Sequence, residues 1–336
     1  MKKHILLIFI MFGLVHTAIA IDSTQVSKNK GPLLGSNLYP FYLPFINLHP
    51  QRAMTLEAGE ILLSFSNNYA NTFNWDRDGM DDGFQFDVDV ENTRFEIDFN
   101  YGITSWLEVG VEGSYVIQYG GVLDPVIRGF HDLFGLANAG RERVTDNLFE
   151  ITVKNENGTW IELLEPVSGL QDIALKAKLS ILRLPKKGFH ISAQSAVKIP
   201  VGDEEKLLSS GKLDYALNLL VEKTGYNYGV YLNLGWLHLG QPDNLTIFEF
   251  KPDLFSYMFS YEWLIRGGWS LYIQADGNTS PFNSGHKRLD HQTGTVSLGF
   301  KCFLSSNSML QFSFSEEFFT FATTDFGVQT GLTFFF

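Results

Sequence analysis

The sequence predicts an all-β fold: a transmembrane antiparallel up-and-down β-barrel of about 12 strands. Three observations carry this prediction. Many segments alternate apolar and polar residues with the two-residue period of a β-strand. The connections between these segments are short and long in turn. Beyond the first 20 residues, no uninterrupted apolar run reaches the roughly 18 residues expected of a transmembrane helix.

The first 20 residues have the pattern of a cleaved signal peptide. Lys2 and Lys3 supply a positive start, residues 5–15 form an apolar stretch, and Ala18-Ile19-Ala20 offers small residues at a cleavage site. The apolar stretch is too short to span a bilayer as a helix, which takes about 20 residues. We therefore expect a secreted chain whose mature part begins at residue 21.

The composition excludes several classes of function. The chain has 25 Lys and Arg against 37 Asp and Glu, and this acidic excess argues against a nucleic-acid partner. The single cysteine, Cys302, allows neither an internal disulfide nor a cysteine-based metal cluster. No spacing of histidines and acids matches a known metal motif, so the sequence predicts no metal site and no cofactor.

Twelve segments carry the strand period. They lie at residues 61–65, 94–100, 107–112, 172–179, 191–197, 213–219, 228–234, 255–261, 269–274, 295–301, 310–315 and 325–336. An even number of strands is what single-chain bacterial barrels have. In the last segment Phe336, Phe334 and Leu332 share one parity. An aromatic residue at the end of such a strand resembles the C-terminal assembly signal of bacterial outer-membrane barrels, which implies the barrel assembly machinery as a partner.

The connections sort into two alternating classes. Short ones lie near residues 101–104, 184–188, 223–226, 266–268 and 305–308, and longer ones at 70–91, 119–169, 200–211, 239–252, 278–289 and 319–324. Outer-membrane barrels have tight periplasmic turns and long surface loops, whereas a soluble β-sandwich has no reason to sort its loops in this way.

The polar parity of the strands contains ten charged residues. A charge that faces lipid near the bilayer midplane costs several kcal/mol, so these side chains are predicted to face the lumen. They are Glu96, Asp98, Glu108, Glu112, Lys176, Lys178, Lys198, Asp276, Lys301 and Glu317. Two interpretations remain open: the charges line an open pore, or they pair with one another and fill a narrow barrel.

Three segments are not expected to form barrel wall: residues 21–56, the stretch 70–91 and the longest loop, 119–169. Residues 21–56 form an N-terminal periplasmic segment in which Pro40, Pro44 and Pro50 prevent regular pairing, so it is either a strap across the mouth or a plug in the lumen. The acidic stretch 70–91 is predicted to be a solvated loop, because its spacing does not match a calcium loop. The barrel itself, including its loops, is predicted to span residues 57–336.

The longest loop, 119–169, is predicted to contain structure of its own. Asp124-Pro125 begins a helix, and a hairpin turns at Asn157-Gly158. This loop is either a gate over the mouth or a free surface loop.

No convincing catalytic constellation is present. His190 and Ser192 have the spacing of a base and a nucleophile on one strand face. They have the lumen parity, however, lie beside a short turn and lack an identifiable orienting group. We predict a structural histidine and no enzyme.

Several short motifs resemble a known family. They are Ser168-Gly-Leu-Gln-Asp-Ile-Ala-Leu-Lys-Ala-Lys178, Val197-Lys-Ile-Pro-Val-Gly-Asp203 with Ser210-Gly-Lys-Leu-Asp-Tyr-Ala216 after it, and the opening Gly31-Pro-Leu. They are similar to a bacterial outer-membrane barrel family recorded only as a domain of unknown function, of a porin-like or substrate-uptake type. The resemblance implies a location in the bacterial outer membrane, among its lipid and lipopolysaccharide, and it implies no catalytic residue.

Three functions remain open at this stage. The first is a narrow passive channel or uptake barrel, the second an outer-membrane hydrolase of lipid or peptide, and the third a non-conducting structural or adhesive barrel.

Overall fold

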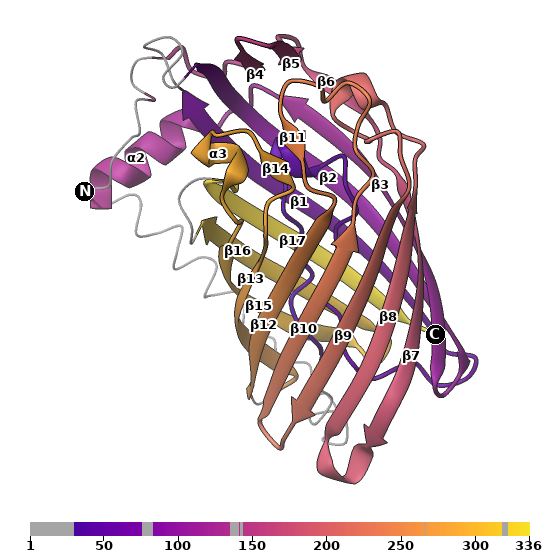
Figure 1. The fold of residues 1–336 in the computed structure, drawn as a ribbon. Helices are drawn as coiled ribbons and strands as arrows, with labels where there is room; N and C mark the ends of the chain where they lie inside the picture. Colours follow the sequence, from indigo (N-terminus) through magenta and orange to yellow (C-terminus); the bar gives the residue numbers. More distant parts are fainter. Residues whose placement is uncertain (1–29, 76–82, 135–140, 142–143, 266, 318–321) are drawn as a thin grey trace.

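The computed structural model describes residues 30–75, 83–134, 141, 144–265, 267–317 and 322–336. The predicted signal peptide, residues 1–20, lies outside the described residues. A closed antiparallel barrel of 12 strands forms the wall, which confirms the predicted fold class and strand number (Figure 1). The wall strands are β1 (Ile61–Trp75), β2 (Phe84–Thr104), β3 (Leu107–Tyr119), β7 (Ile173–Leu184), β8 (Phe189–Ile199), β9 (Asp214–Thr224), β10 (Tyr228–His238), β12 (Asp253–Ile265), β13 (Trp269–Asn278), β15 (Thr295–Ser305), β16 (Ser308–Glu317) and β17 (Phe326–Phe335).

The remaining elements are not part of the ring of wall strands. They are helices α2 (Asp124–Phe134) and α3 (Lys287–Asp290), strands β4 (Glu150–Asn155), β5 (Gly158–Leu163), β6 (Val167–Leu170), β11 (Glu249–Phe250) and β14 (Phe282–Asn283), and 3-10 turns at Pro40–Tyr42, Pro185–Lys187 and Glu204–Lys206. Within the described residues, no helix combines the length and the apolarity that crossing a bilayer requires.

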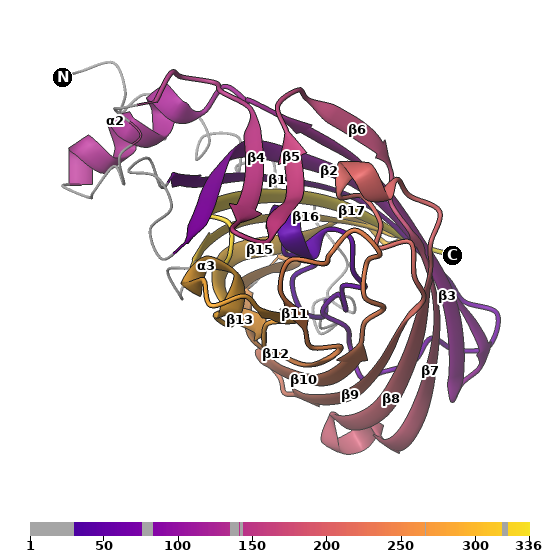
Figure 2. The ribbon, with the colours of Figure 1, turned by 45° about the horizontal axis from the view of Figure 1, so that its top comes forward.

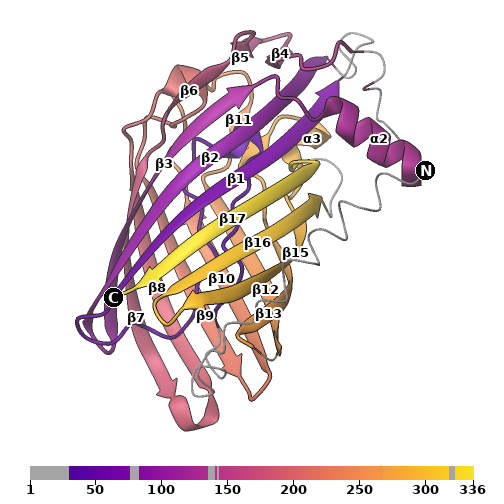
Figure 3. The same cartoon turned by 180° about the vertical axis from the view of Figure 1, so that it is seen from behind.

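The ring closes through neighbouring strands all the way round. Each wall strand pairs with the next one along the chain, and β1 pairs with β17 from Leu62↔Phe335 to Asn71↔Phe326 (Figure 3). Ile61 and Phe336 extend this seam by exchanging two backbone hydrogen bonds of 2.9 Å. Closure leaves no edge strand within the ring of described wall strands, which is the condition for a sheet to stand in lipid.

The alternation of the sequence becomes an apolar outside and a polar inside. On β9 the side chains of Leu217 and Leu219 are exposed. Asn218 between them and Asp214 at the start of the strand are buried. Half-exposed apolar side chains recur around the ring at Phe95, Ile97, Phe259, Ile273 and Leu298. Exposed aromatic residues stand near both strand ends, with Tyr101, Trp106 and Trp263 at one end and Tyr215, Trp236 and Phe255 at the other. An apolar belt between aromatic girdles is the outer face that lipid requires.

The strands β1 and β2 are longer than the sequence predicted. The expected loop at 70–91 was wrong over most of its length, because β1 continues to Trp75 and β2 starts at Phe84. The upper part of β2 finds a different partner there: it pairs with β4, from Phe84↔Asn155 to Asp89↔Glu150, and not with β3. The acidic residues of this part conceal the strand period. Of the predicted acidic loop, Asp76, Asp78, Asp81 and Asp82 lie outside the described residues.

The loop at 119–169 contains the predicted helix and hairpin. Helix α2 begins at Asp124, and β4 and β5 form a hairpin. Its register pairs Asn155 with Gly158, so the turn residues are Glu156 and Asn157, one position earlier than expected.

The chain from Lys30 to Leu56, which we call the inner segment, runs inside the barrel (Figure 2). It rises from the short-turn end along β12–β16, reaches an apex at residues 39–45 near the long-loop mouth, and returns along β8–β10 to β1. Because its two limbs contact opposite walls, it occupies the lumen in which the functional site must be sought.

Candidate functional site

The lumen contains a charged cluster on β2, β3 and β7. The Lys176 ammonium lies 2.6 Å from Asp98 and 3.1 Å from Glu112, and Arg94 Nη2 lies 3.2 Å from Glu96 Oε2. All five side chains are buried. The alternation of the strands brings them to one face, and antiparallel register places Asp98 directly opposite Glu112.

Two further predicted residues form a separate pair closer to the short-turn end. Lys178 Nζ lies 2.9 Å from Glu108 Oε1, and both side chains are buried. Glu108 also accepts a 3.0 Å hydrogen bond from the Leu56 backbone N–H, at the end of the inner segment. The pair therefore ties the wall to the returning limb.

Lys198 on β8 holds the apex of the inner segment. Its ammonium lies 2.8 Å from Asp172 and 3.1 Å from Asp214, and it donates at 2.7 Å to the Pro44 carbonyl. Asp214 in turn accepts a 2.8 Å bond from the Ile46 N–H. A buried cation thus pairs with two carboxylates, one on β9 and one just before β7, and with one carbonyl of the inner segment.

Lys301 on β15 contacts the rising limb. Its ammonium donates at 2.5 Å to the Pro32 carbonyl, and Leu33 N–H donates at 2.9 Å to Gln274 on β13. Nearby, the Lys30 backbone N–H donates to Glu262 at 3.1 Å and its ammonium donates to Ser270 at 2.8 Å. Polar side chains of the wall therefore hold the rising limb, mostly by hydrogen bonds to its backbone N–H and carbonyl groups.

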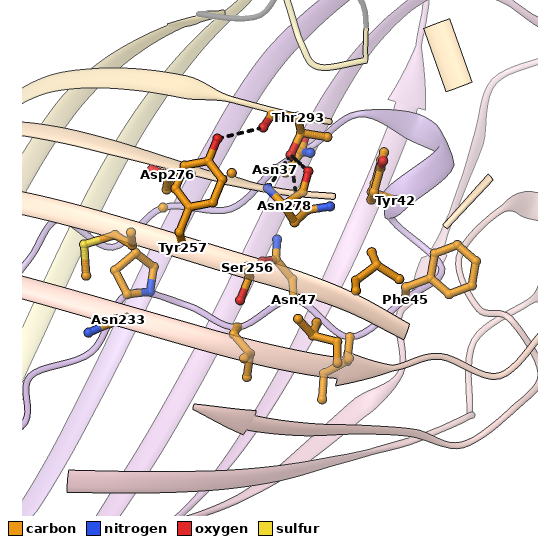
Figure 4. A pocket seen from close by; sticks show the side chains of 18 of the residues that line it. Asn37, Tyr42, Phe45, Asn47, Asn233, Ser256, Tyr257, Asp276, Asn278 and Thr293 are labelled. Carbon is orange, nitrogen blue, oxygen red and sulfur yellow. Dashed lines mark hydrogen bonds between the residues drawn. The ribbon is translucent and has the colours of Figure 1, made fainter. Parts of the chain in front are cut away.

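The remaining two predicted residues stand apart from these clusters. Asp276 accepts a 3.0 Å bond from the Thr295 hydroxyl and lines a cavity of about 60 Å³ together with Tyr257 and Asn278 (Figure 4). Glu317 lies at the long-loop end of β16, where its electrostatic neighbours are Asp325, Glu316 and Arg288.

Sequence reasoning did not identify Arg52 and His49, which both lie on the returning limb. Arg52 forms an ion pair of 2.5 Å with Glu222, whose side chain is fully buried on β9. His49 is buried between two wall carboxylates, with Nε2 at 2.7 Å from Glu112 and 3.3 Å from Glu96. Burial alone would lower the pKa of the His49 imidazole, but Glu112 and Glu96 outweigh burial and raise that pKa to about 9. The one signal in the sequence was the presence of two ionisable side chains within two positions of Pro50, in a segment whose one other charged residue is Lys30.

The mouth on the long-loop side is filled by a hydrophobic cluster that we call the mouth core. It combines the apex of the inner segment with the upper part of β2, the β4–β5 hairpin and several of the long loops. The rings of Phe41 and Trp160 are 5.4 Å apart, as are those of Phe41 and Phe86 and those of Trp160 and Phe282. All of these aromatic side chains are buried, so this end of the lumen is closed in the structure.

At the opposite end the lumen opens into a cavity of about 620 Å³, which we call the vestibule. Its wall contains Asp98, Glu222 and Lys301, and Arg52 of the inner segment also lines it. Residues beside the short turns, such as Pro185 and Asn307, mark its outer edge. The vestibule is thus lined by both charged and apolar side chains, and it ends against the inner segment.

The pair His190 and Ser192 has no catalytic arrangement. Both side chains are buried in the lumen, and the Ser192 hydroxyl donates to the Ala53 carbonyl of the inner segment. The hydroxyl proton is therefore directed to a backbone carbonyl and not to an imidazole, which a nucleophile would require.

Solved structures of similar fold are outer-membrane barrels. The COG4313 outer membrane channel from Pseudomonas putida F1 is 14% identical, with a TM-score of 0.56 over 86% of this chain and 100% of that chain. The NanC porin is 6% identical with a TM-score of 0.44, over 81% and 98% of the two chains. A search of curated proteins found no match.

Together with the exposed apolar belt, the closed ring identifies a β-barrel of the bacterial outer membrane, in contact with its lipid. A family model matches residues 7–336, nearly the whole chain, and this agrees with the resemblance seen in the short motifs. The chain belongs to the family described as a protein of unknown function (DUF3187).

Proposed function

We propose that this barrel is a narrow passive channel whose lumen is closed by the inner segment acting as a plug. The observation that carries the proposal is the vestibule, a cavity with charged side chains in its wall that leads from the short-turn end to the inner segment and stops there. A solved barrel of the same fold is described as an outer membrane channel, which agrees with this function.

The ties between plug and wall are of a kind that can be broken and remade. Apart from the chain itself, which continues from the inner segment into β1, the contacts in the described residues are hydrogen bonds and ion pairs such as Arg52–Glu222 and Lys198–Pro44. An apolar filling would have been the more stable way to close a barrel permanently, because buried ion pairs often add little net stability. Polar ties support a plug that moves.

The mouth core acts as a second barrier. Its aromatic rings come from the apex of the plug and from surface loops, so displacement of the plug also removes part of the mouth core. The loop at 119–169 contributes Trp160 and takes part in this gate. Movement of the plug therefore affects both ends of the lumen, because its apex at residues 39–45 belongs to the mouth core and its two limbs reach the vestibule.

The vestibule supports weak ion selectivity. Five acidic and five Lys or Arg side chains line it, so neither sign of charge prevails along the path. We propose that small solutes of either charge pass once the plug is displaced.

Three further points belong to the same proposal. The barrel is not an enzyme, which the occupied Ser192 hydroxyl supports. The barrel assembly machinery inserts it by recognising Leu332 and Phe334 on β17 and the terminal Phe336, which is largely exposed. Lipopolysaccharide surrounds the long-loop end of the belt.

Planar-bilayer recording of the refolded mature protein tests this function. We expect wild type to give rare, small openings, Arg52→Ala to conduct more often, and Arg183→Ala to match wild type, because Arg183 pairs with Glu57 and not with a buried wall carboxylate. Currents in 0.1 M against 1 M KCl should reverse close to zero voltage. Absence of current from every variant, with the barrel shown to be folded by heat-modified gel mobility, would exclude the channel and favour a structural or adhesive barrel.

A further inference from the structure

The His49 side chain presents one ring nitrogen to the inner segment and the other to the wall. Nδ1 lies 3.0 Å from the Gly35 carbonyl oxygen, and a carbonyl can only accept a hydrogen bond. Nδ1 must therefore carry a hydrogen. This fixes the orientation of the ring and directs Nε2 away from the inner segment, toward β2 and β3.

Nε2 points at two carboxylates. Glu112 Oε1 is 2.7 Å away and Glu96 Oε2 is 3.3 Å away, and the three ligand atoms lie within 4.8 Å of one another. In the described part of the chain, neither Nε2 nor Glu96 Oε2 has a hydrogen bond of good geometry, although both are buried. A nitrogen lone pair repels two carboxylate oxygens at these distances, so a positive species has to stand between them. It is either a proton or a metal ion.

The charges around the ring favour a divalent ion. Glu96 and Glu112 face the ring, Asp98 lies opposite Glu112 and shares Lys176 with it, and Asp276 interacts electrostatically with His49 from β13. Arg94 and Lys176 supply two positive charges, so two negative charges remain. A proton on His49 would neutralise one of them, and a divalent ion would neutralise both.

We propose that His49, Glu96 and Glu112 form a binding site for one divalent transition-metal ion, with zinc as the best match. An imidazole nitrogen with carboxylate oxygens is a ligand set that zinc uses, commonly with water in the fourth position. A backbone carbonyl that accepts from the other ring nitrogen is the usual support for a metal-bound histidine. Binding replaces the proton on Nε2, which is released to solvent.

Arg94 lies next to the site, and its guanidinium has to move when the ion binds. Its Nη2 lies 3.2 Å from Glu96 Oε2 and 3.5 Å from Glu112 Oε1, the same oxygens that face His49. A void of about 30 Å³ beside Arg94 and Glu112 leaves space for the guanidinium to shift and for a water ligand. Because His49 belongs to the plug while Glu96 and Glu112 belong to the wall, the ion would fasten one to the other.

Metal binding to the full mature chain in detergent tests the site directly. The protein is refolded with a chelator, exchanged into buffer and titrated with Co²⁺ and then Zn²⁺ alone. We expect one ion per chain, a visible d–d absorption typical of low-coordinate Co²⁺, and its loss when Zn²⁺ displaces Co²⁺. The variants His49→Gln, Glu96→Gln and Glu112→Gln should each bind at least about tenfold more weakly, since even indirect ligand supports contribute that much.

Matched controls lie on the same wall. Glu108→Gln changes the other buried glutamate of β3, and His190→Gln changes another buried histidine of the lumen. Both should bind as wild type does. Equal binding by His49→Gln and wild type, or no Co²⁺ spectrum in wild type, would overturn the site and leave a proton on His49. The wild-type titration decides the question even if a variant fails to fold, and it requires no conductance, so its failure leaves the proposed channel untouched.

Discussion

Arg52 and Glu222 form a two-point ion pair inside the barrel, with Nη2 donating to Oε1 at 2.5 Å and Nε donating to Oε2 at 3.2 Å. Glu222 is fully buried, and Gly31 packs against the stem of Arg52 so closely that an added Cβ would lie 2.6 Å from Arg52 Cγ. Arg52→Ala should leave the buried carboxylate uncompensated and destabilise the protein by about 3 kcal/mol. Urea unfolding in detergent measures the loss, and hydrogen exchange over residues 30–56 should show faster exchange in the variant.

Arg183→Ala is the matched control for this prediction. Arg183 pairs with Glu57, and both side chains are substantially exposed, so the loss should stay under about 1 kcal/mol. Equal losses in the two variants would mean that the Arg52 pair does not hold the inner segment.

Lys198→Met should be strongly destabilising. The substitution keeps most of the side-chain volume but leaves Asp172 and Asp214 buried without their cation, at a cost of about 3–5 kcal/mol. The exposed Lys212, which pairs with Asp243 at the surface, provides the control Lys212→Met with a change under about 1 kcal/mol. Thermal unfolding of both variants tests this prediction, and a mild effect of Lys198→Met would show that the two carboxylates find other partners.

Trp160→Ala should open the mouth core. Trp160 is buried against Phe41 and Phe282, and its removal should cost about 3–5 kcal/mol locally. We expect faster protease cleavage within residues 144–165 of the folded protein and more frequent openings in bilayer recordings. The exposed Trp106 gives the control Trp106→Ala, which should change neither readout. Unchanged cleavage in Trp160→Ala would contradict a closed mouth held by this core.

Leu219→Arg should test the lipid belt. Leu219 faces outward at the middle of β9, so a charge there should cost about 2–4 kcal/mol in lipid. Val201→Arg places the same charge at a similarly exposed position beyond the end of β8, where we expect almost no loss. The comparison uses urea unfolding from vesicles, and equal losses at the two positions would argue against the assigned membrane face.

The sequence predicts the wall well because the wall has a period. Alternation along β9 and β17 follows directly from one face in lipid and one face in the lumen. It is hidden only where both faces are polar or covered, as in the upper part of β2, where Asp87 and Asp89 are buried beside β4. The predicted loop at 70–91 failed for that reason.

The contents of the lumen could not be predicted in the same way. The inner segment has no repeating period, and its partners lie far away along the chain, as Glu222 does from Arg52 and Glu112 from His49. The sequence around His49, between Leu48 and Pro50, gives no indication that Glu96 and Glu112 contact its side chain. Ten charged residues could be assigned to the polar parity, but which of them pair with each other depends on register and barrel closure, which no local pattern contains.

The central claim is that a movable inner segment closes a conducting lumen, and a charge exchange at its main ion pair tests it most directly. Arg52→Glu should place two carboxylates in contact, expel the returning limb and raise the open probability in single-channel recordings well above that of wild type. Arg52→Glu combined with Glu222→Arg should restore the pair and return the open probability toward the wild-type level. If the single exchange conducts no more than wild type while the barrel is folded, the inner segment does not close a channel.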